Sequence, residues 1–334
     1  MTPKERLYAR LDGSAVDKIP NLNIMMALAA RMAGVNYARY VQDYKVLVEG
    51  NLICAEKFGL DAVSVVSDPM REASAYGAQI EFPDNGVPFS RTPLIRSPGD
   101  AAKLINFDPL DSPRTLDRVR GVEALYKRTA GKYPVIGWVE GVLAALADLR
   151  GVSELMVDLA DEEDYLEETM EFILAGQCRF AKVQVEAGAD IIGVGNAVAS
   201  LVGPAIYDKF AVQYDRRLVE YIKSLGAKVK LHICGNSTAL LPKIRDLVKP
   251  DIMDIDWMVD FEKAVKLFSG TRTVINGNMD PVSVMLRGDA DTVHEAVLHC
   301  IKASQSNTCI AAGCEIPVDT PEDNLLTMNR LLYI

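Results

Sequence analysis

The sequence predicts an α/β protein with the (β/α)8 TIM-barrel fold, and three observations support this. The chain has 334 residues, which suits one barrel domain of roughly 250 residues with insertions. Short β-branched runs alternate with amphipathic helical stretches, as in βαβ units that build a parallel sheet. Nearly every run is apolar until its C-terminal end and then turns polar, and the active site of such barrels lies at that face.

Eight segments carry this strand pattern, and each is followed by a helical stretch or a loop. They are residues 18–26, 61–68, 133–141, 189–196, 227–235, 250–256, 272–280 and 307–314. Residues 205–226 and 290–304 are two of the amphipathic stretches that follow. An open doubly wound sheet is the competing fold, but no Gly-rich phosphate loop follows any strand, which favours the closed barrel.

Two segments lie outside this alternation. Residues 1–18 predict a helical extension that closes one end of the barrel. Residues 81–115 are rich in Pro, Gly and Asp, and they follow the second strand, which ends at Asp68. We expect them to form a loop or lid insertion within a single domain that spans residues 1–334.

Composition limits the partners and the compartment. The net charge of −10 argues against nucleic acid, because phosphate contacts need an excess of Lys and Arg. The charged N-terminus lacks the apolar region of a signal peptide, and no run of about 18 apolar residues predicts a membrane span. We therefore expect a cytoplasmic protein whose six cysteines are reduced.

The segment "KLHICGN" (230–236) predicts a metal site. His232 and Cys234 lie two residues apart on a strand and therefore point the same way. Cys314 ends the eighth strand, which lies across the barrel mouth from the fifth. One imidazole and two thiolates suit Zn²⁺, and three protein ligands with a free fourth position are typical of a catalytic site.

The remaining cysteines have an ordinary structural explanation. Cys54, Cys178 and Cys300 fall on helical patterns beside apolar residues, as buried cysteines do, and Cys309 enters the last strand at its far end. His294 and His299 share a helix but are five residues apart, so they do not share one face. We interpret them as surface residues.

A zinc ion in this setting suits methyl transfer. A thiol at the fourth position is deprotonated by the ion and becomes a nucleophile at neutral pH. In the opposite direction, the ion polarises an ether oxygen or binds a leaving group as a Lewis acid.

The sequence also resembles the uroporphyrinogen decarboxylase superfamily, and within it the corrinoid methyltransferase branch, which includes methylcobamide:coenzyme M and chloromethane-type enzymes. The matching segments are residues 232–256, 276–289 and 311–328, the last with "TPEDN" at 320–324. The resemblance implies a (β/α)8 barrel that holds zinc with an H-x-C pair and a distant Cys. These ligands correspond to His232, Cys234 and Cys314.

Porphyrinogen decarboxylation is the alternative within this superfamily. Its decarboxylases carry an arginine-rich "RQAGR"-like motif near the start, where this chain has "NIMMALAARMAG". Met25 and Met26 occupy the mouth of the first strand and are candidate substrate contacts, and Arg31 is a poor substitute for that motif. Asp68, in "SDPMREASAYG", resembles the superfamily's strand-two aspartate and is a candidate catalytic residue that shapes or hydrogen-bonds the pocket.

Further polar residues at strand ends complete the predicted site. Glu140 lies within an otherwise apolar run and is a candidate fourth zinc ligand or a proton acceptor, with a raised pKa unless it is paired. The alternative is a structural ion pair with a neighbouring barrel residue. Asn196, Asp254 and Asn278 are candidates for orienting the substrate or the metal ligands. Trp138 and Trp257 suggest a partly apolar pocket, compatible with an aromatic methoxy donor.

The methyl donor, the acceptor and the direction of transfer stay open. A thiol such as coenzyme M is one acceptor, and a methoxy or other methylated compound is one donor. No B12-binding D-x-H-x-x-G motif occurs, so the resemblance implies a cobamide carried by a partner corrinoid protein or arriving free. A non-catalytic binding role is the remaining alternative, and it predicts no open zinc position.

Overall fold

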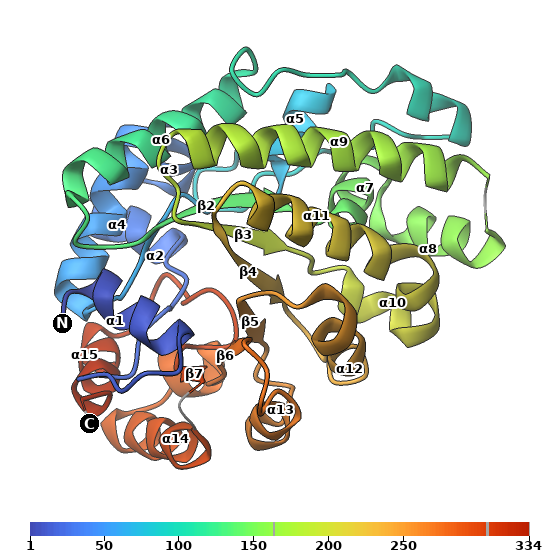
Figure 1. Cartoon of the computed structure of the whole chain (residues 1–334). Coiled ribbons are helices and arrows are strands. Elements are labelled where there is room, and N and C mark those ends of the chain that lie inside the picture. The colour runs from blue at the N-terminus through green and yellow to red at the C-terminus, as the bar shows by residue number, and fades with distance from the viewer. Residues whose placement is uncertain (163, 305–306, 334) are drawn as a thin grey trace.

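The computed structural model describes residues 1–162, 164–304 and 307–333. A seven-stranded parallel sheet curls through the centre, and helices surround it (Figure 1). The strands follow chain order from β1 to β7: β1 Val63–Ser64, β2 Val135–Glu140, β3 Ile191–Gly195, β4 Lys228–Ile233, β5 Ile252–Ile255, β6 Val274–Asn276 and β7 Thr308–Cys309. This mixed α/β architecture confirms the predicted barrel-type fold.

Helices follow most strands and cover the outer face of the sheet. They are α1 Pro3–Leu11, α2 Ala27–Met32, α3 Tyr37–Gln42, α4 Tyr44–Phe58, α5 Met70–Tyr76, α6 Pro113–Thr129, α7 Val142–Arg150, α8 Val152–Asp161, α9 Tyr165–Glu186, α10 Ala199–Ile206, α11 Val212–Ser224, α12 Leu241–Lys243, α13 Phe261–Leu267, α14 Ala290–Ala303 and α15 Glu322–Leu331. The structure also has one 3₁₀ helix, η1 Pro98–Lys103, and three π-helical segments: η2 Tyr207–Ala211, η3 Ile244–Val248 and η4 Pro281–Leu286.

The first predicted strand, residues 18–26, is not regular, and this part of the prediction is wrong. Its backbone does bond both neighbours: Asp61 N donates to Asn21 O at 2.9 Å, and Ile310 N donates to Pro20 O at 3.1 Å. Pro20 has no N–H, and the Asn21 N–H is taken by the Asp61 carboxylate at 2.7 Å. The segment therefore spans the opening between β1 and β7 through single bonds instead of a continuous ladder.

Strand register aligns the predicted polar residues in one row. Glu140 pairs with Gly195, Gly195 with His232, and His232 with Asp254. The row continues from Asp254 to Asn276 and from Asn276 to Cys309. Because partners in a parallel sheet point to the same face, the side chains of this row point into the barrel.

The barrel interior and the outer layer form two apolar cores. The inner core includes Ile136 and Trp138 of β2, Ile191 of β3, Ile252 of β5 and Val274 of β6. A larger core lies between the sheet and the helices, where Val229, Leu231 and Ile233 of β4 alternate with the inward side chains. This alternation places Lys230 and His232 in the barrel interior.

The N-terminal helix α1 lies against the N-terminal ends of the strands, as predicted. Thr2 and Glu5 form a capping box that starts the helix. Lys4 reaches Asp190 before β3 at 2.6 Å, and Arg10 Nε donates to Thr308 O of β7 at 2.6 Å. The two ends of the chain lie side by side, where Ile19 N donates to Leu332 O at 2.9 Å (Figure 1).

The predicted insertion at residues 81–115 is mostly loop. It contains an antiparallel bridge between Glu81 and Phe89 and the short helix η1, and its last three residues begin α6. The loop is fixed on α7, since Ile95 N donates to Leu149 O at 2.9 Å. Its function as a lid, and the division of the chain as one domain, stay predictions.

Candidate metal centre

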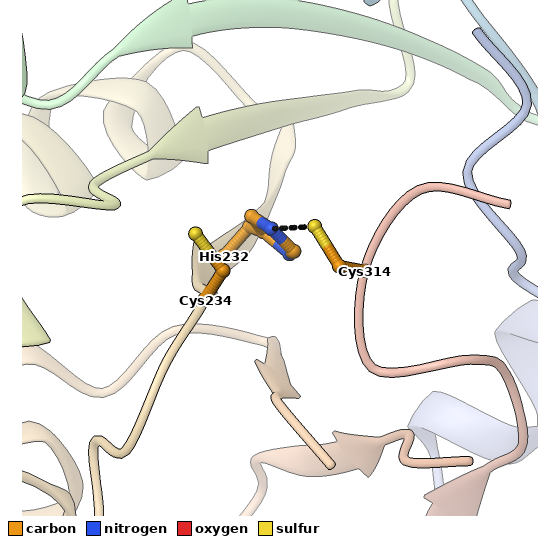
Figure 2. A group of neighbouring side chains, drawn as sticks. All are labelled: His232, Cys234 and Cys314. Atoms are coloured by element: carbon orange, nitrogen blue, oxygen red, sulfur yellow. Dashed lines mark hydrogen bonds between the residues drawn. The ribbon is translucent and has the colours of Figure 1, made fainter. Parts of the chain in front are cut away.

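Three side chains from distant parts of the chain meet at the C-terminal end of the sheet. His232 is the fifth residue of β4, Cys234 follows that strand, and Cys314 lies in the loop after β7. Their ligand atoms all lie within 4.8 Å of one another, and His232 Nε2 is 3.8 Å from Cys314 Sγ (Figure 2). In Figure 2, the Cys314 side chain points toward the imidazole from the opposite segment.

The imidazole is oriented by Asp254 of β5, its partner in the strand register. His232 Nδ1 lies 3.1 Å from Asp254 Oδ2, so Nε2 is the nitrogen that faces the thiols. Asp254 also forms an ion pair with the buried Lys230, and its Oδ1 accepts from Asn276 Nδ2 at 2.8 Å. A histidine fixed through one ring nitrogen by a carboxylate is a typical arrangement around zinc ligands.

The protonation of these groups reflects their mutual contacts. A hydrogen bond with Cys314 lowers the pKa of Cys234, whereas the same contact and burial raise the pKa of Cys314 to about 12. Cys234 therefore loses its proton more readily than Cys314. Burial opposes charge on His232, but its hydrogen bonds with Asp254 and Cys314 raise its pKa to about 9.

The three residues fit a zinc ion. Around a tetrahedral Zn²⁺ with bonds of about 2.0–2.3 Å, ligand atoms lie roughly 3.5–3.8 Å apart. The separation of 3.8 Å between His232 Nε2 and Cys314 Sγ falls at this distance. Binding displaces the protons from the imidazole Nε2 and the thiols, because zinc ligands bind in their deprotonated forms.

Glu140 lies outside the ligand group and faces an arginine. Among the described residues, His232, Cys234 and Cys314 form the group close enough to hold an ion, and Glu140 is not part of it. Its Oε1 accepts from Arg71 Nη2 at 2.7 Å and from Trp138 Nε1 at 3.3 Å. The hydrogen bond with Cys314 lowers the pKa of Cys234, and the Glu140 charge is a smaller contribution in the opposite direction. This geometry favours the proton-acceptor role over the fourth-ligand role.

A buried cluster of carboxylates surrounds Glu140, and the sequence reasoning missed most of it. Glu72 Oε1 accepts from Glu140 N at 2.8 Å, and Arg71 Nε lies 3.3 Å from Glu72 Oε2. Burial raises the pKa of Glu140 to about 7 and also raises the pKa of Glu72 and Asp148. One sequence feature did point to this cluster, because Asp148 is a carboxylate within the apolar run "VLAALADL".

Asp68 lies beside this cluster and has several partners of its own. Its Oδ2 accepts from Ser67 Oγ at 2.7 Å and from Arg114 Nη2 at 2.6 Å, and its Oδ1 accepts from Met70 N at 3.0 Å. Burial opposes its ionisation, but Arg114 and Arg71 hold the pKa of Asp68 below its usual value. Asp68 therefore accepts a hydrogen bond from the first residue of α5 and forms an ion pair with Arg114 of α6. Its catalytic role stays a prediction.

Asn196 links the metal ligand strand to a second buried carboxylate. Asn196 N donates to His232 O at 2.9 Å, and its side-chain amide donates to both oxygens of Asp215 at 2.9 Å. Tyr207 donates to Asp215 Oδ2 at 2.8 Å. Burial raises the pKa of Asp215 to about 7. Asn196 thus supports the backbone of β4, and no sequence pattern indicated its partner Asp215.

The remaining predicted contacts are divided between the interior and the rim. Met25 is buried, and Met26 is partly buried just before α2. The Asn278 amide donates to Asp256 O at 3.0 Å and Val259 O at 2.6 Å, which holds the loop after β5. Trp257 in that loop is 48% exposed, whereas Trp138 is buried and its ring centroid lies 6.1 Å from that of His232. Substrate contact by Met25, Met26, Asn278 and Trp257 stays a prediction.

Comparisons with known proteins assign this chain to one family. The uroporphyrinogen decarboxylase (URO-D) family model matches residues 2–332. The chain therefore belongs to the uroporphyrinogen decarboxylase family, as the sequence resemblance predicts.

Relatives with different activities match along most of the chain. Methylcobamide:CoM methyltransferase MtbA of Methanosarcina mazei is 28% identical, over 98% of this chain and 96% of the relative. Uroporphyrinogen decarboxylase of Gloeobacter violaceus is 27% identical, over 86% of this chain and 87% of the relative. The solved structure of a methyltransferase from Methanosarcina mazei has a TM-score of 0.88 at 23% identity, over 98% of this chain and 97% of that one. The last likeness shows the shared fold.

Membrane insertion by a helix finds no support in the part of the chain that the structure describes. None of its helices combines the length with the apolar character that a bilayer span requires.

Proposed function

We propose that this protein is a zinc-dependent methyltransferase that moves a methyl group between a corrinoid, carried by a partner protein, and a small substrate. The observation that carries the proposal is the His232, Cys234 and Cys314 group, with ligand atoms within 4.8 Å of one another at the barrel mouth. Two relatives from Methanosarcina species that carry the name methylcobamide:CoM methyltransferase MtbA support it. We infer a thiol acceptor, such as coenzyme M.

In this proposal, His232 Nε2 and the sulfurs of Cys234 and Cys314 hold the ion, and Asp254 keeps the imidazole in the orientation that binding needs. Bound zinc supplies a Lewis acid that stabilises a substrate thiolate at neutral pH. Three protein ligands would be fewer than a closed structural zinc site uses, which is typical of a catalytic site that is open to substrate. The two thiolates keep the site electron-rich, which favours attack on a methyl group.

The proton of the substrate thiol needs an acceptor, and we assign this role to Glu140. Its pKa of about 7 suits a general base near neutral pH. The Arg71 guanidinium at 2.7 Å holds the carboxylate, and the buried Trp138 ring limits the access of water beside His232. Asn196 and Asp254 act by positioning β4 and the imidazole.

Decarboxylation is less well supported, although a decarboxylase is among the relatives. Both oxygens of Asp68 already accept hydrogen bonds within the protein. The His, Cys and Cys group also has no part in a decarboxylation that needs no metal. A purely binding role does not explain why His232, Cys234 and Cys314 lie together at the barrel mouth.

The test is the metal content of anaerobically purified protein, followed by methyl transfer from methylcobalamin. We expect about one zinc per chain, loss of zinc in Cys234→Ser, and consumption of methylcobalamin with coenzyme M in the wild type but not in Cys234→Ser. Cys178→Ser is the matched control, because Cys178 is a half-buried thiol on α9, away from the site.

Two outcomes count against the proposal. A wild-type protein that binds no zinc after incubation with the metal excludes the site. The second outcome is a protein that binds zinc but transfers no methyl group, either to thiols or from methoxy compounds to cob(I)alamin. This result would support the metal site and exclude the proposed methyl transfer.

A further inference from the structure

A basic cavity lies at the opposite end of the barrel from the candidate metal centre. A cavity of about 810 Å³ lies beside the N-terminal ends of β4, β5 and β6 and the end of α1. Its volume lies within the range of small-molecule sites, about 300–1,000 Å³. Its lining includes Lys223, Lys228, Arg245, Lys249 and Arg272.

The cavity is basic in a protein that is acidic as a whole. Five cationic side chains line it, with Asp12 and Asp251 as the acidic members, whereas the chain has a net charge of −10. Asp246 lies nearby and pairs with Arg245 at 2.7 Å. Positive charge therefore exceeds negative charge even when all three acids are included. A cavity lined mainly by charges of one sign has a concentrated electrostatic potential, which attracts ions of the opposite charge.

Several cationic side chains in this cavity have N–H donors that form no hydrogen bond within the described part of the protein. Lys223 and Lys228 both approach Asp251, but each ammonium is 3.4 Å from the carboxylate, longer than a strong charged hydrogen bond. The Lys223 ammonium also donates to Lys249 O at 2.6 Å, which leaves its other donors. Within the described ranges, the Lys249 ammonium and the Arg272 guanidinium form no hydrogen bond or ion pair. Lysine supplies three donors and arginine five, so most of these N–H groups face solvent.

The floor of the cavity is rigid. Asp251 Oδ2 accepts from Val229 N at 2.9 Å, and its backbone carbonyl accepts from Val274 N at 2.8 Å. Thr273 Oγ1 donates to Pro250 O at 2.7 Å. These bonds fix the starts of β4, β5 and β6, so a ligand meets positions that are already ordered and loses less entropy on binding.

We propose that this cavity binds a small, multiply charged anion, such as an oligophosphate or a polycarboxylate. Five cations line the cavity, and two of them, Lys249 and Arg272, have no ion-pair partner among the described residues, which suits a ligand with more than one anionic group. None of the lining residues is aromatic, so no ring is present to stack on a nucleobase, which favours a ligand without one. The site is separate from the methyl-transfer centre and does not depend on the proposed function.

Lys249 offers a variant that separates binding from folding. Its φ is 53°, in the left-handed region, where it ends η3. Glycine adopts this conformation without steric cost. Lys249→Gly therefore removes the charge and relieves the backbone, and we expect a Tm equal to or above that of the wild type. Any loss of binding then comes from the missing ammonium.

The experiment is isothermal titration of the whole protein with sodium triphosphate and, separately, with citrate. We expect saturable one-site binding that weakens with added salt. A single charge removal, Lys249→Gly or Arg272→Gln, should weaken binding up to about fivefold, and the double variant by at least about tenfold. Lys302→Gln, an exposed cation on α14, is the control and should bind like the wild type.

The relative affinity of the two probes identifies the type of anion. Tighter binding of triphosphate assigns the site to phosphates, and tighter binding of citrate assigns it to carboxylates. No binding of either probe at millimolar concentration overturns the proposal, and so does binding that the double variant retains. Zinc content should be the same in all variants, because the cavity and the metal site are at opposite ends of the strands.

Discussion

Asp254 provides a test of how the metal site is held. Replacement by Asn removes the carboxylate that lies 3.1 Å from His232 Nδ1 and leaves the three proposed ligands in place. Loss of such a supporting carboxylate typically lowers metal affinity by about 10–100-fold, or about 1.4–2.7 kcal/mol. We expect this loss in a competition titration of Asp254→Asn against a zinc chelator of known affinity.

The same substitution also affects the fold, because Asp254 pairs with Lys230. The Lys230 side chain is 1% exposed, so removal of the carboxylate leaves a buried ammonium without its partner. Breaking such a pair typically costs about 3–5 kcal/mol of unfolding free energy. Urea denaturation of the metal-free protein should show this decrease in Asp254→Asn.

A double variant separates the two effects. Lys230→Met removes the buried charge with a side chain of similar length, so Asp254→Asn/Lys230→Met should regain much of the stability. Its zinc affinity should stay about 10–100-fold below the wild type. Zinc affinity within about twofold of the wild type in a stable double variant would refute the role of Asp254.

Three further predictions concern buried groups near the site. Glu140→Gln should lower kcat/KM with a thiol by about 100-fold and remove a rise in rate through about pH 7, since a base acts only when deprotonated, whereas unchanged pH–rate profiles would contradict its role. The pKa of Asp215 is raised to about 7 from 3.8, so the folded state holds a proton that the unfolded state releases, and stability falls as pH rises between these values, by up to about 4 kcal/mol. Asp215→Asn should flatten this fall in urea titrations from pH 4 to pH 8, and an identical slope in both proteins would show that Asp215 is already ionised. Gly193→Ala places a Cβ 2.1 Å from the Trp138 ring, so it should lower the unfolding free energy by about 1–3 kcal/mol, and no change in Tm would mean that the ring moves freely.

The sequence predicted the fold and the ligand group because both depend on local patterns. The alternation of apolar runs and amphipathic helices is sufficient for a parallel sheet, and polar residues at strand ends indicate the face where function lies. His232 and Cys234 are two residues apart on one strand, so their common direction follows from strand geometry. Cys314 could be added because closure of the barrel brings the last strand near the fifth.

Other features were decided by tertiary structure, because they depend on contacts between residues far apart in the chain. Residues 18–26 have a strand-like composition, but Asp61 takes the Asn21 N–H, and this competition is invisible along the chain. Arg71, Glu72 and Asp148 meet around Glu140 only when α5, α7 and β2 pack together, and the raised pKa values of the three carboxyl groups arise from desolvation there. The basic cavity likewise joins four segments that no motif connects. Local periodicity therefore determined the architecture and the direction of His232 and Cys234, whereas burial and long-range pairing decided the electrostatics around the proposed metal site.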